Sequence, residues 1–506
     1  MKNLLLIGLG PHAKRIYFPL TQQTKEEVRL TAIVELEEKR EDIAQYLASK
    51  NTIVNTVLIP SEQRTYTTLH PTIEATLDNI VKQAPIHGVI IATEPLTHVM
   101  YAKWALRNNL SILMDKPVST QKNISTNSTA AKKVLQEFQE LKALYEEKKD
   151  RVVFSLMAQR RFHPAFRLAR SLIEDCTTQT NCPVTSIQSF HSDGQWRMPT
   201  EIVEQTYHPY MQGYGKCSHS GHHFFDIVPY FLEAGTSKNK YYDNVDIFAN
   251  FLHPNDFLRQ ITLADYKRLF GKENFLQHNK YSFQELQKRM TLCGEIDAFS
   301  TLAFKKGKKV MTLASINLVH NGFARRDWVT SQGRDLYKGN GRVRHESHII
   351  EQGPFQSLHI HSYQASEVNV NEKSCLYAVG GEHHLELSVF KNTGMIGGKP
   401  VEIFSMKDLM QPVLSDASRG HQEDARAQGF FEFIACLNDN NAPRTSDLLS
   451  HEAAVTLFSG VYQSAIAQRE ERNPNINLPI TIKKNSLCRD SAPFNSTEEK
   501  TCMNSR

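Results

Sequence analysis

Residues 3–15, NLLLIGLGPHAKR, decide the fold, because they join a short apolar run to the glycine-containing turn GLGPHA. An apolar run of this length predicts a strand buried on both faces, as in a parallel sheet. Gly8 would permit a tight turn, Gly10 would let the backbone approach a pyrophosphate, and Ala13 would let the next helix pack closely on the strand. The stretch therefore predicts the strand, turn and helix start that open a dinucleotide-binding domain.

The same alternation continues along the first 120 residues. Further apolar runs lie at 29–35, 56–59, 87–93 and 110–114, and segments of helical length lie at 12–24, 37–50, 71–83 and 96–108. Strands that alternate with helices build parallel βαβ units. We therefore predict an α/β fold in which residues 1–120 form a doubly wound parallel sheet.

A second α/β domain is predicted over residues 121–483. Strand-like alternation indicates one large sheet, and its segments lie at 184–193, 310–320, 342–350, 356–364, 375–379 and 383–391. Helical segments are expected at 130–148, 422–437 and 447–468. Residues 236–295 are polar and aromatic with weak periodicity, which favours a partly helical insertion. Residues 484–506 lack apolar periodicity, so we expect a flexible tail.

The composition is typical of a soluble globular protein of two or three domains, with 40% hydrophobic and 22% charged residues. A net charge of +5 is mild for 506 residues and no basic run is interleaved with aromatics, so nucleic acid is not expected as a partner. No apolar run is long enough to cross a bilayer. The eight cysteines contain no CxxC pair, which favours free thiols and a cytoplasmic location.

The end of the second predicted strand indicates the cofactor. Glu35 stands there, where a carboxylate can accept hydrogen bonds from an adenosine ribose and would repel a 2′-phosphate. NAD is therefore favoured over NADP. Lys39 and Arg40 follow closely and keep NADP as the alternative, although solvated helix residues are the simpler interpretation.

Two loops follow the fourth and fifth predicted strands, ATEPLTH at 92–98 and MDKP at 114–117. The carboxyl ends of parallel strands line the ligand crevice of an open sheet, so both loops are expected to face the cofactor. Lys116 stands in the second loop, beside Pro117, which restricts the backbone. The alternative is an ordinary surface lysine before a turn proline.

These motifs, taken together, resemble the Gfo/Idh/MocA oxidoreductases, relatives of glucose-fructose oxidoreductase and inositol dehydrogenase. The resemblance rests on GLGPHA, on HGVIIATEPLTHVMYAKWALRNNLSILMDKPVS at 87–119, on GHHFFD at 221–226 and on RTSDLLSHEAAVTLFSGVYQSAIAQ at 444–468. It implies an N-terminal Rossmann domain and a C-terminal α/β domain. The open, mostly antiparallel sheet of the second domain would cover the active site and form a homo-oligomer contact.

The resemblance also implies a set of cofactor-binding residues. They are Gly8, Gly10, Pro11, His12, Ala13, Glu35, Thr93, Glu94, Pro95, His98, Asp115 and Lys116. The family's usual loop reads EKP, so Asp115 is a shorter acid of the same charge. In such enzymes the lysine lies beside the nicotinamide and assists proton transfer from the substrate hydroxyl.

HSGHHFFD, residues 219–226, is similar to the family pattern D-x-G-x-H-x-x-D. His223 falls on the family histidine, whereas His219 replaces the first aspartate. Three hypotheses compete: a metal site, an inert helix start with an apolar phenylalanine face, and a proton relay. We favour the relay, with Lys116, His223 and His219 as catalytic residues and no metal, since imidazole exchanges protons near neutral pH.

The expected function is an NAD(P)-dependent oxidoreductase acting on a secondary alcohol or ketone of a sugar, cyclitol or related small molecule. Alternatives on the same fold are a non-catalytic cofactor-binding regulator and a hydrolase or lyase that uses the cofactor transiently. Flanking residues could form the substrate pocket, although such residues are also common on surfaces. They are Arg160, Arg161, Trp196, Arg197, His208 and Tyr210.

Overall fold

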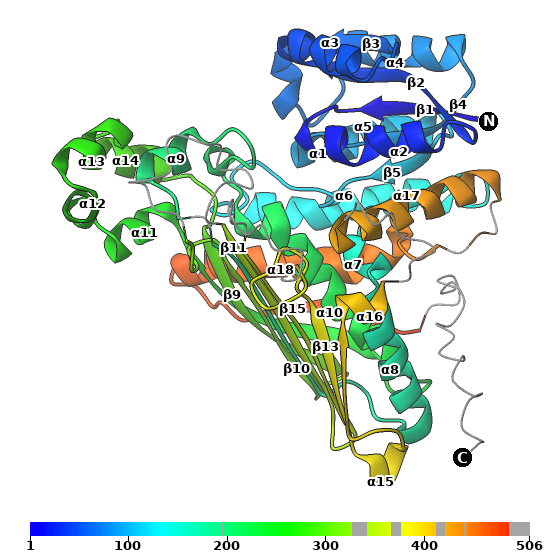
Figure 1. The fold of residues 1–506 in the computed structure, drawn as a ribbon, viewed down its shortest axis with the longest axis vertical. Helices are drawn as coiled ribbons and strands as arrows, with labels where there is room; N and C mark the ends of the chain where they lie inside the picture. The colour runs from blue at the N-terminus through cyan, green and yellow to red at the C-terminus, as the bar shows by residue number, and fades with distance from the viewer. Residues whose placement is uncertain are drawn as a thin grey trace, which may run out of the picture.

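Two sheets organise the chain (Figure 1). The computed structural model describes residues 1–194, 196–325, 342–365, 376–410, 420–439, 442 and 444–484. The tail expected from residue 484 onward lies outside these residues, apart from Lys484 itself. None of the helices within the described ranges is long and apolar enough to span a lipid bilayer.

The N-terminal sheet has six parallel strands, which confirms the doubly wound fold. Their order is β3 (Asn55–Ile59), β2 (Val28–Leu36), β1 (Lys2–Ile7), β4 (Ile86–Ile91), β5 (Ser111–Met114) and β6 (Phe154–Leu156). The connecting helices are α1 (Pro11–Arg15), α2 (Tyr17–Gln23), α3 (Arg40–Ser49), α4 (Pro71–Gln83), α5 (His98–Arg107) and α6 (Ser128–Glu146). The sixth strand lies beyond residue 120, where the sequence pattern changes. The strand order reverses between β1 and β4, so a ligand crevice is expected at the carboxyl ends of these strands.

The apolar run of β1 is explained by burial on both faces of the sheet. Leu5 and Ile7 belong to one hydrophobic core, and Leu4 and Leu6 belong to the other. Gly8 ends the strand with a φ of +94°, and a Cβ there would stand 2.6 Å from the carbonyl oxygen of Ala92. Only glycine therefore lets the turn after β1 lie against the end of β4.

The second sheet has nine strands and is mostly antiparallel, as expected. Their order is β14 (Val401–Ser405), β13 (Glu386–Lys391), β12 (Gln356–Ala365), β11 (Val343–Gln352), β7 (Ser186–Gly194), β10 (Lys309–Val319), β9 (Asp297–Lys306), β8 (Tyr242–Leu252) and β15 (Ile476–Ile482). β7 and β10 pair in parallel.

The expected strands differ from this sheet at several places. Residues 376–379 form turns, so the strand expected at 375–379 is wrong for the described part, and residue 375 lies outside it. The sequence patterns did not indicate β8, β9, β14 and β15. In β8 the buried Val245, Ile247 and Ala249 alternate with partly exposed positions that include polar ones, which weakens the apolar signal.

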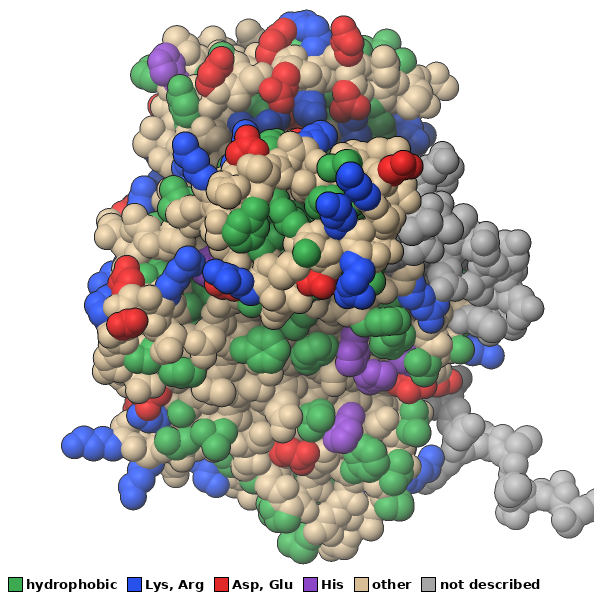
Figure 2. Space-filling view, turned by 90° about the vertical axis from the view of Figure 1, so that its left-hand side faces the viewer, with side chains coloured by type: hydrophobic (Ala, Val, Ile, Leu, Met, Phe, Trp, Pro, Cys, Tyr) green, Lys and Arg blue, Asp and Glu red, His purple; other side chains and the backbone are tan. Residues whose placement is uncertain are grey.

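Helices cover one face of the second sheet (Figure 1). They are α8 (Pro164–Thr180), α10 (His222–Ala234) and α18 (Glu452–Arg469), and α17 (His421–Asn438) packs against the first domain. No described helix covers the opposite face. Figure 2 looks onto that face, where hydrophobic and histidine side chains gather. Exposed positions there include Phe299, Leu313 and Ile403.

Most of the range expected as an insertion forms a helical subdomain. The helices are α11 (Pro254–Gln260), α12 (Leu263–Phe270), α13 (Lys272–His278) and α14 (Phe283–Met290), joined by α9 (Pro199–Glu204). They share a separate hydrophobic core that includes Ile202, Phe257, Tyr266 and Leu286. The subdomain therefore supports α9 and the loop after it, which borders the site described next.

Candidate functional site

A cavity of about 1120 Å³ lies at the carboxyl ends of the Rossmann strands and extends to the second sheet. This volume exceeds the usual size of a pocket for one small molecule. The expected residues that line it are Gly8, Gly10, Pro11, His12, Glu35, Thr93, Glu94, Pro95, Asp115, Lys116, Arg160, Arg197, His208, His219 and His223. Those that do not line it are Ala13, His98, Arg161, Trp196 and Tyr210.

Ala13 and His98 support the cofactor side of the cavity from outside its lining. Ala13 is fully buried where α1 packs on the sheet, as expected for that position. His98 begins α5, with Nδ1 2.8 Å from the carbonyl oxygen of Pro117 and Nε2 3.1 Å from that of Thr93. It therefore links the two loops after β4 and β5 from behind the cavity.

Arg161 and Trp196 make structural contacts in the second domain, and Tyr210 packs against the His219 ring. Arg161 lies in α7 (Gln159–Phe162) and binds both carboxylate oxygens of the buried Asp226, at 3.0 and 2.6 Å. Trp196 stacks on Tyr266 and donates a hydrogen bond to its hydroxyl, within the helical subdomain. Both residues are remote from the cavity lining because these partners hold them elsewhere.

The cofactor half of the cavity fits a dinucleotide. A Cβ at Gly10 would meet nothing within 4 Å, so the turn leaves open space beside its backbone. The Glu35 carboxylate accepts hydrogen bonds from the backbone amides of Leu9 (2.6 Å) and Leu36 (2.8 Å), which fix it at the end of β2. Of the two cations nearby, Lys39 is exposed and lines the cavity. Arg40 is held by Glu37 at 2.7 Å.

The loop after β5 places an ionised acid beside the lysine. The Asp115 carboxylate lies 3.4 Å from Nε2 of His12 and accepts a hydrogen bond from the Lys116 backbone amide. Burial favours the neutral acid, but the nearby His12 and Lys116 outweigh it and lower the pKa of Asp115. Burial lowers the pKa of His12 to about 4, so its imidazole is neutral near pH 7.

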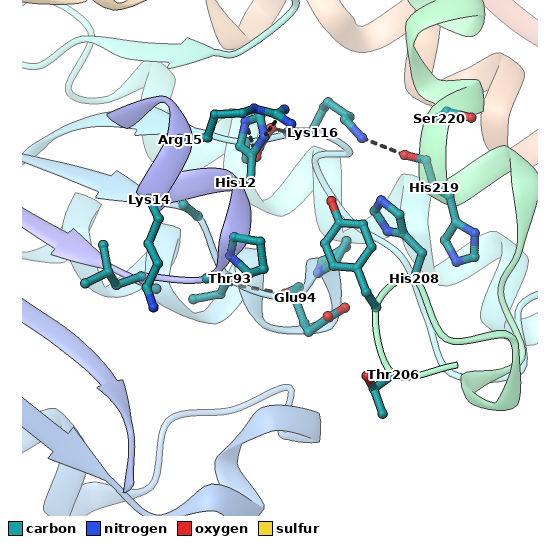
Figure 3. A pocket seen from close by; sticks show the side chains of 18 of the residues that line it. His12, Lys14, Arg15, Thr93, Glu94, Lys116, Thr206, His208, His219 and Ser220 are labelled. Carbon is teal, nitrogen blue, oxygen red and sulfur yellow. Dashed lines mark hydrogen bonds and ion pairs between the residues drawn. The ribbon is translucent and has the colours of Figure 1, made fainter. Parts of the chain in front are cut away.

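Lys116 joins the two domains at the cavity. Its Nζ donates a hydrogen bond of 2.5 Å to the backbone carbonyl of His219, 103 positions away (Figure 3). Burial lowers the pKa of Lys116, Asp115 opposes that shift, and Arg426 and Arg160 add to it. An ammonium group in this environment gives up its proton more readily than a solvated lysine.

The carbonyl that receives this hydrogen bond lies in an irregular helical segment. Residues Cys217–Gly221 form a π-helical turn that leads into α10. A Cβ at Gly221 would stand 2.6 Å from Cδ1 of Leu318, so the turn packs closely on β10. Such turns are frequent at functional sites. Here the turn carries His219 to the cavity wall.

The three histidines of HSGHHFFD have different surroundings. His219 and His223 line the cavity, whereas His222 faces His451 instead. Burial holds the pKa of His219 and of His223 well below the usual value, so both imidazoles are neutral. The two ring nitrogens of His219 are buried and have no hydrogen-bond partner among the described residues.

Aromatic rings surround the His219 imidazole. It stacks on His208 at 4.7 Å between ring centroids and meets the edges of Tyr210 and Tyr214. His208 has a φ of +52°, a left-handed conformation that is uncommon for a non-glycine residue and is found at functional sites. Gln205 supports it, since its amide donates to the carbonyl oxygens of Tyr207 and His208. The loop is therefore built to present the His208 ring.

The sequence patterns did not indicate several residues of the site and its supports. Tyr214 does not line the cavity, but it donates a hydrogen bond of 3.0 Å to Glu94, which ties the second domain to the loop after β4. Asp193, Arg342 and Arg344 lie at the ends of β7 and β11 and line the cavity. Charged residues at alternate positions of a strand expected to be half-buried were the signal that could have indicated them.

The described part of the chain contains no group of three or more histidine, cysteine, aspartate or glutamate side chains that could hold a metal ion. A zinc site would require a third ligand beside His219 and His223, and the described residues supply none. The cavity instead combines a glycine turn, an acid at the ribose position and a lysine.

These features are those of an NAD-binding Rossmann domain. Residues 2–153 match the family model described as "Oxidoreductase family, NAD-binding Rossmann fold". This match makes the N-terminal domain similar to the NAD-binding domain of the Gfo/Idh/MocA family. A search among curated protein sequences finds no match.

Solved structures resemble nearly the whole chain. Aldose-aldose oxidoreductase from Caulobacter crescentus is 13% identical with a TM-score of 0.54, covering 95% of this chain and 99% of that one. An inositol dehydrogenase homologue from Azotobacter vinelandii, complexed with NADH and myo-inositol, is 12% identical with a TM-score of 0.54, covering 95% and 97%. Apo scyllo-inositol dehydrogenase from Lactobacillus casei is 12% identical with a TM-score of 0.50, covering 95% and 98%. At these identities the likeness shows a shared fold.

Proposed function

We propose that this protein is a dehydrogenase or reductase that moves a hydride between nicotinamide and a secondary alcohol or ketone of a sugar, cyclitol or related small molecule. One observation carries the proposal: Lys116 Nζ reaches the backbone of His219, and both residues share a cavity with His223 and the cofactor turn at Gly8. The family match and the sugar and inositol dehydrogenases of similar fold support it.

The cofactor half suits NAD. The turn from Gly8 to Ala13 would hold the pyrophosphate, because Gly10 leaves open space there. Glu35 would accept hydrogen bonds from the adenosine ribose and disfavour a 2′-phosphate. Thr93, Glu94, Pro95, His98 and Asp115 would shape the nicotinamide end. When bound, the nicotinamide supplies the hydride acceptor or donor.

Lys116 and the histidines would supply the proton path. In oxidation, a neutral Lys116 accepts the hydroxyl proton, and burial makes that neutral form more accessible. The His219 carbonyl orients the lysine nitrogen toward the shared cavity. His223 would be a second proton acceptor. The His219 ring would bind another substrate hydroxyl, because neither of its nitrogens has a partner among the described residues. Such placement of reacting groups is worth roughly 7 to 11 kcal/mol of the barrier.

The test is turnover of the purified full chain with NAD or NADP and a panel of polyols that includes myo-inositol and glucose. Reduced nicotinamide would be followed by absorbance, and products by mass spectrometry. We expect reduction of NAD with at least one member, faster than reduction of NADP. Cofactor binding without any chemical change would favour a regulator, and product without net reduced cofactor would favour a hydrolase or lyase.

The open face of the second sheet is proposed as a homo-oligomer contact (Figure 2). Leu313 and Ile403 are each more than three-fifths exposed there, which is unusual for large apolar side chains on a sheet face. Phe190, His345 and His361 add a partly exposed ring cluster on the same face. A second copy of the chain would bury these side chains.

We also propose that the protein works in the cytoplasm and acts on small molecules, with no nucleic-acid or membrane partner. Four cysteines in the described residues are free thiols, which supports a reducing compartment. They are Cys176, Cys182, Cys217 and Cys293. Cell fractionation with an antibody against the chain would test the location.

A further inference from the structure

Charged side chains stand in a row where the second sheet meets the cavity. Arg342 and Arg344 line the cavity at the start of β11, and Glu346 follows on the same face because strand residues alternate sides. Asp193 of β7 stands opposite Arg344 in the antiparallel register. Arg160 of α7 reaches the row from the helix layer. The inner face is thus polar at this end of the sheet.

Two of these three arginines have a carboxylate partner. Arg342 binds both oxygens of Asp193, at 2.6 and 2.7 Å. Arg160 binds both oxygens of Glu346, at 2.6 and 2.5 Å. Bidentate pairs of this kind satisfy the charge and much of the hydrogen-bonding capacity of each partner. The acids of the row are therefore already engaged.

Arg344 has no such partner among the described residues. Its Nη1 donates a hydrogen bond of 2.7 Å to the neutral side chain of Gln422, and its Nε is buried without a hydrogen-bond partner. Asp193 lies directly opposite Arg344, but its two carboxylate oxygens accept hydrogen bonds from Arg342. Asp193 and Glu423 offset part of the Arg344 charge, but the buried Nε has no acceptor among the described residues. A buried donor left without an acceptor is costly, so its retention on a cavity wall points to an anion that binds there.

Arg160 offers a further donor in the same row of charged side chains. The Nη1 of Arg160 is also buried without a partner among the described residues. Arg160 is held by Glu346. The backbone of Glu346 lies about 7 Å from that of Arg344, because the two residues are two positions apart on one strand. A single oxyanion between the side chains of Arg344 and Arg160 could accept hydrogen bonds from both.

The same donors lie near the proposed reacting end. Burial is the main cause of the lowered pKa of Lys116 and of Arg344, and the positive charge of Arg426 adds to the shift in both groups. Arg160 also contributes to the shift of Lys116. Arg426 and Arg160 therefore lie within electrostatic reach of Lys116, and the cationic wall is continuous with the catalytic end of the cavity.

We infer that the substrate carries an acidic group, a carboxylate or a phosphate, which binds at Arg344 and the free Nη1 of Arg160. The reacting hydroxyl of the same molecule then lies at Lys116. This inference rests on the proposed dehydrogenase function and narrows its substrate class to acidic sugars or cyclitols. Arginine suits the role, because its planar fork matches the oxygen geometry of both anions.

The test is calorimetric binding to the full chain saturated with NAD, so that the pyrophosphate site is filled. The probes are D-glucuronate, D-glucose 6-phosphate and the neutral D-glucose. We expect at least one acid to bind at least about 10-fold tighter than glucose, with an affinity that falls as salt rises. The acid that binds identifies the group as carboxylate or phosphate. Equal affinity for all three probes, or no binding of either acid, would overturn the inference.

Variants of Arg344 test whether the preference for an acidic probe depends on this side chain. Arg344→Gln should remove the preference for the acid while glucose binding stays within about twofold, and Arg344→Lys should retain part of it. Arg268→Gln is the matched control, because Arg268 lies in α12 with its side chain 72% exposed and outside the cavity. An unchanged preference in a folded Arg344→Gln protein contradicts the inference. If that variant does not fold, a weakened preference for the acid in Arg344→Lys supports the site, and an unchanged preference contradicts it.

The two proposals can fail separately. An acid that binds through Arg344 but is never oxidised or reduced with either cofactor leaves the anion site intact and refutes the dehydrogenase. If neutral polyols reduce NAD with equal efficiency in the wild type and in Arg344→Gln, the proposed dehydrogenase function is supported and the inference of an acidic substrate is refuted.

Discussion

Replacing Lys116 with alanine is the most direct test of the site. The change deletes the ammonium that donates to the His219 carbonyl, and with it the proposed proton acceptor. General acid–base groups contribute about 100- to 10,000-fold to rate, or about 2.7 to 5.4 kcal/mol of the barrier. We therefore expect kcat to fall by that factor in Lys116→Ala, with the Kd for NAD changed less than about threefold.

The folded state should tolerate this substitution. The His219 carbonyl loses its donor, which costs about 1 to 3 kcal/mol, but a half-buried ammonium is no longer partly desolvated, which offsets part of that loss. Melting curves of the two proteins should therefore lie close together. Lys122→Ala is the control, because Lys122 is exposed on the segment that follows the same loop.

The pH profile supplies a second readout. Because burial lowers the pKa of Lys116, its neutral form becomes available below the usual lysine range near 10.4. Oxidation should therefore accelerate as pH rises and reach a plateau at a midpoint below that range. Lys116→Ala should lose this limb. Full turnover by the variant, or an unchanged profile in a variant that still turns over, would refute the role of the lysine.

Four further predictions concern other residues. His219→Asp, which installs the family aspartate, should retain or raise turnover, whereas its complete loss together with loss of bound zinc by elemental analysis would support a metal site. Glu35→Ala should reduce the preference for NAD over NADP in initial-rate measurements, because the group that repels a 2′-phosphate is gone. Asp226→Asn should lower the free energy of unfolding by about 3 to 5 kcal/mol in denaturant titrations, since the buried Arg161 and His451 lose their acid. The pKa of Asp226 lies below its usual value despite burial, because of Arg161 and His451, so its contribution is full above about pH 3.9 and is lost as pH falls further. Leu313→Glu should shift a dimer or larger assembly toward monomer in light scattering, and a mass identical to the wild type would contradict the proposed sheet contact.

The first domain could be predicted from sequence because its signals are local. Each apolar run of the Rossmann sheet reports burial on both faces, as Leu4 and Leu5 show by packing into opposite cores. Gly8 and Lys116 follow strands directly, so their places at the carboxyl edge could be inferred from order alone. The half-buried strands of the second sheet carry weaker patterns, and β8 was missed for that reason.

Only the tertiary structure decided which distant side chains share the cavity. Arg160 and Arg161 are adjacent in sequence, yet one lines the cavity through its pair with Glu346 and the other is held away from it by Asp226. Likewise, Arg344 lies opposite Asp193 in the sheet register, yet the Asp193 carboxylate binds Arg342 instead. Neighbouring residues determine strands and turns, so the sequence pattern predicts them. Charge pairs across the sheet join segments more than a hundred positions apart, as Arg342 and Asp193 do, so only the folded chain shows them.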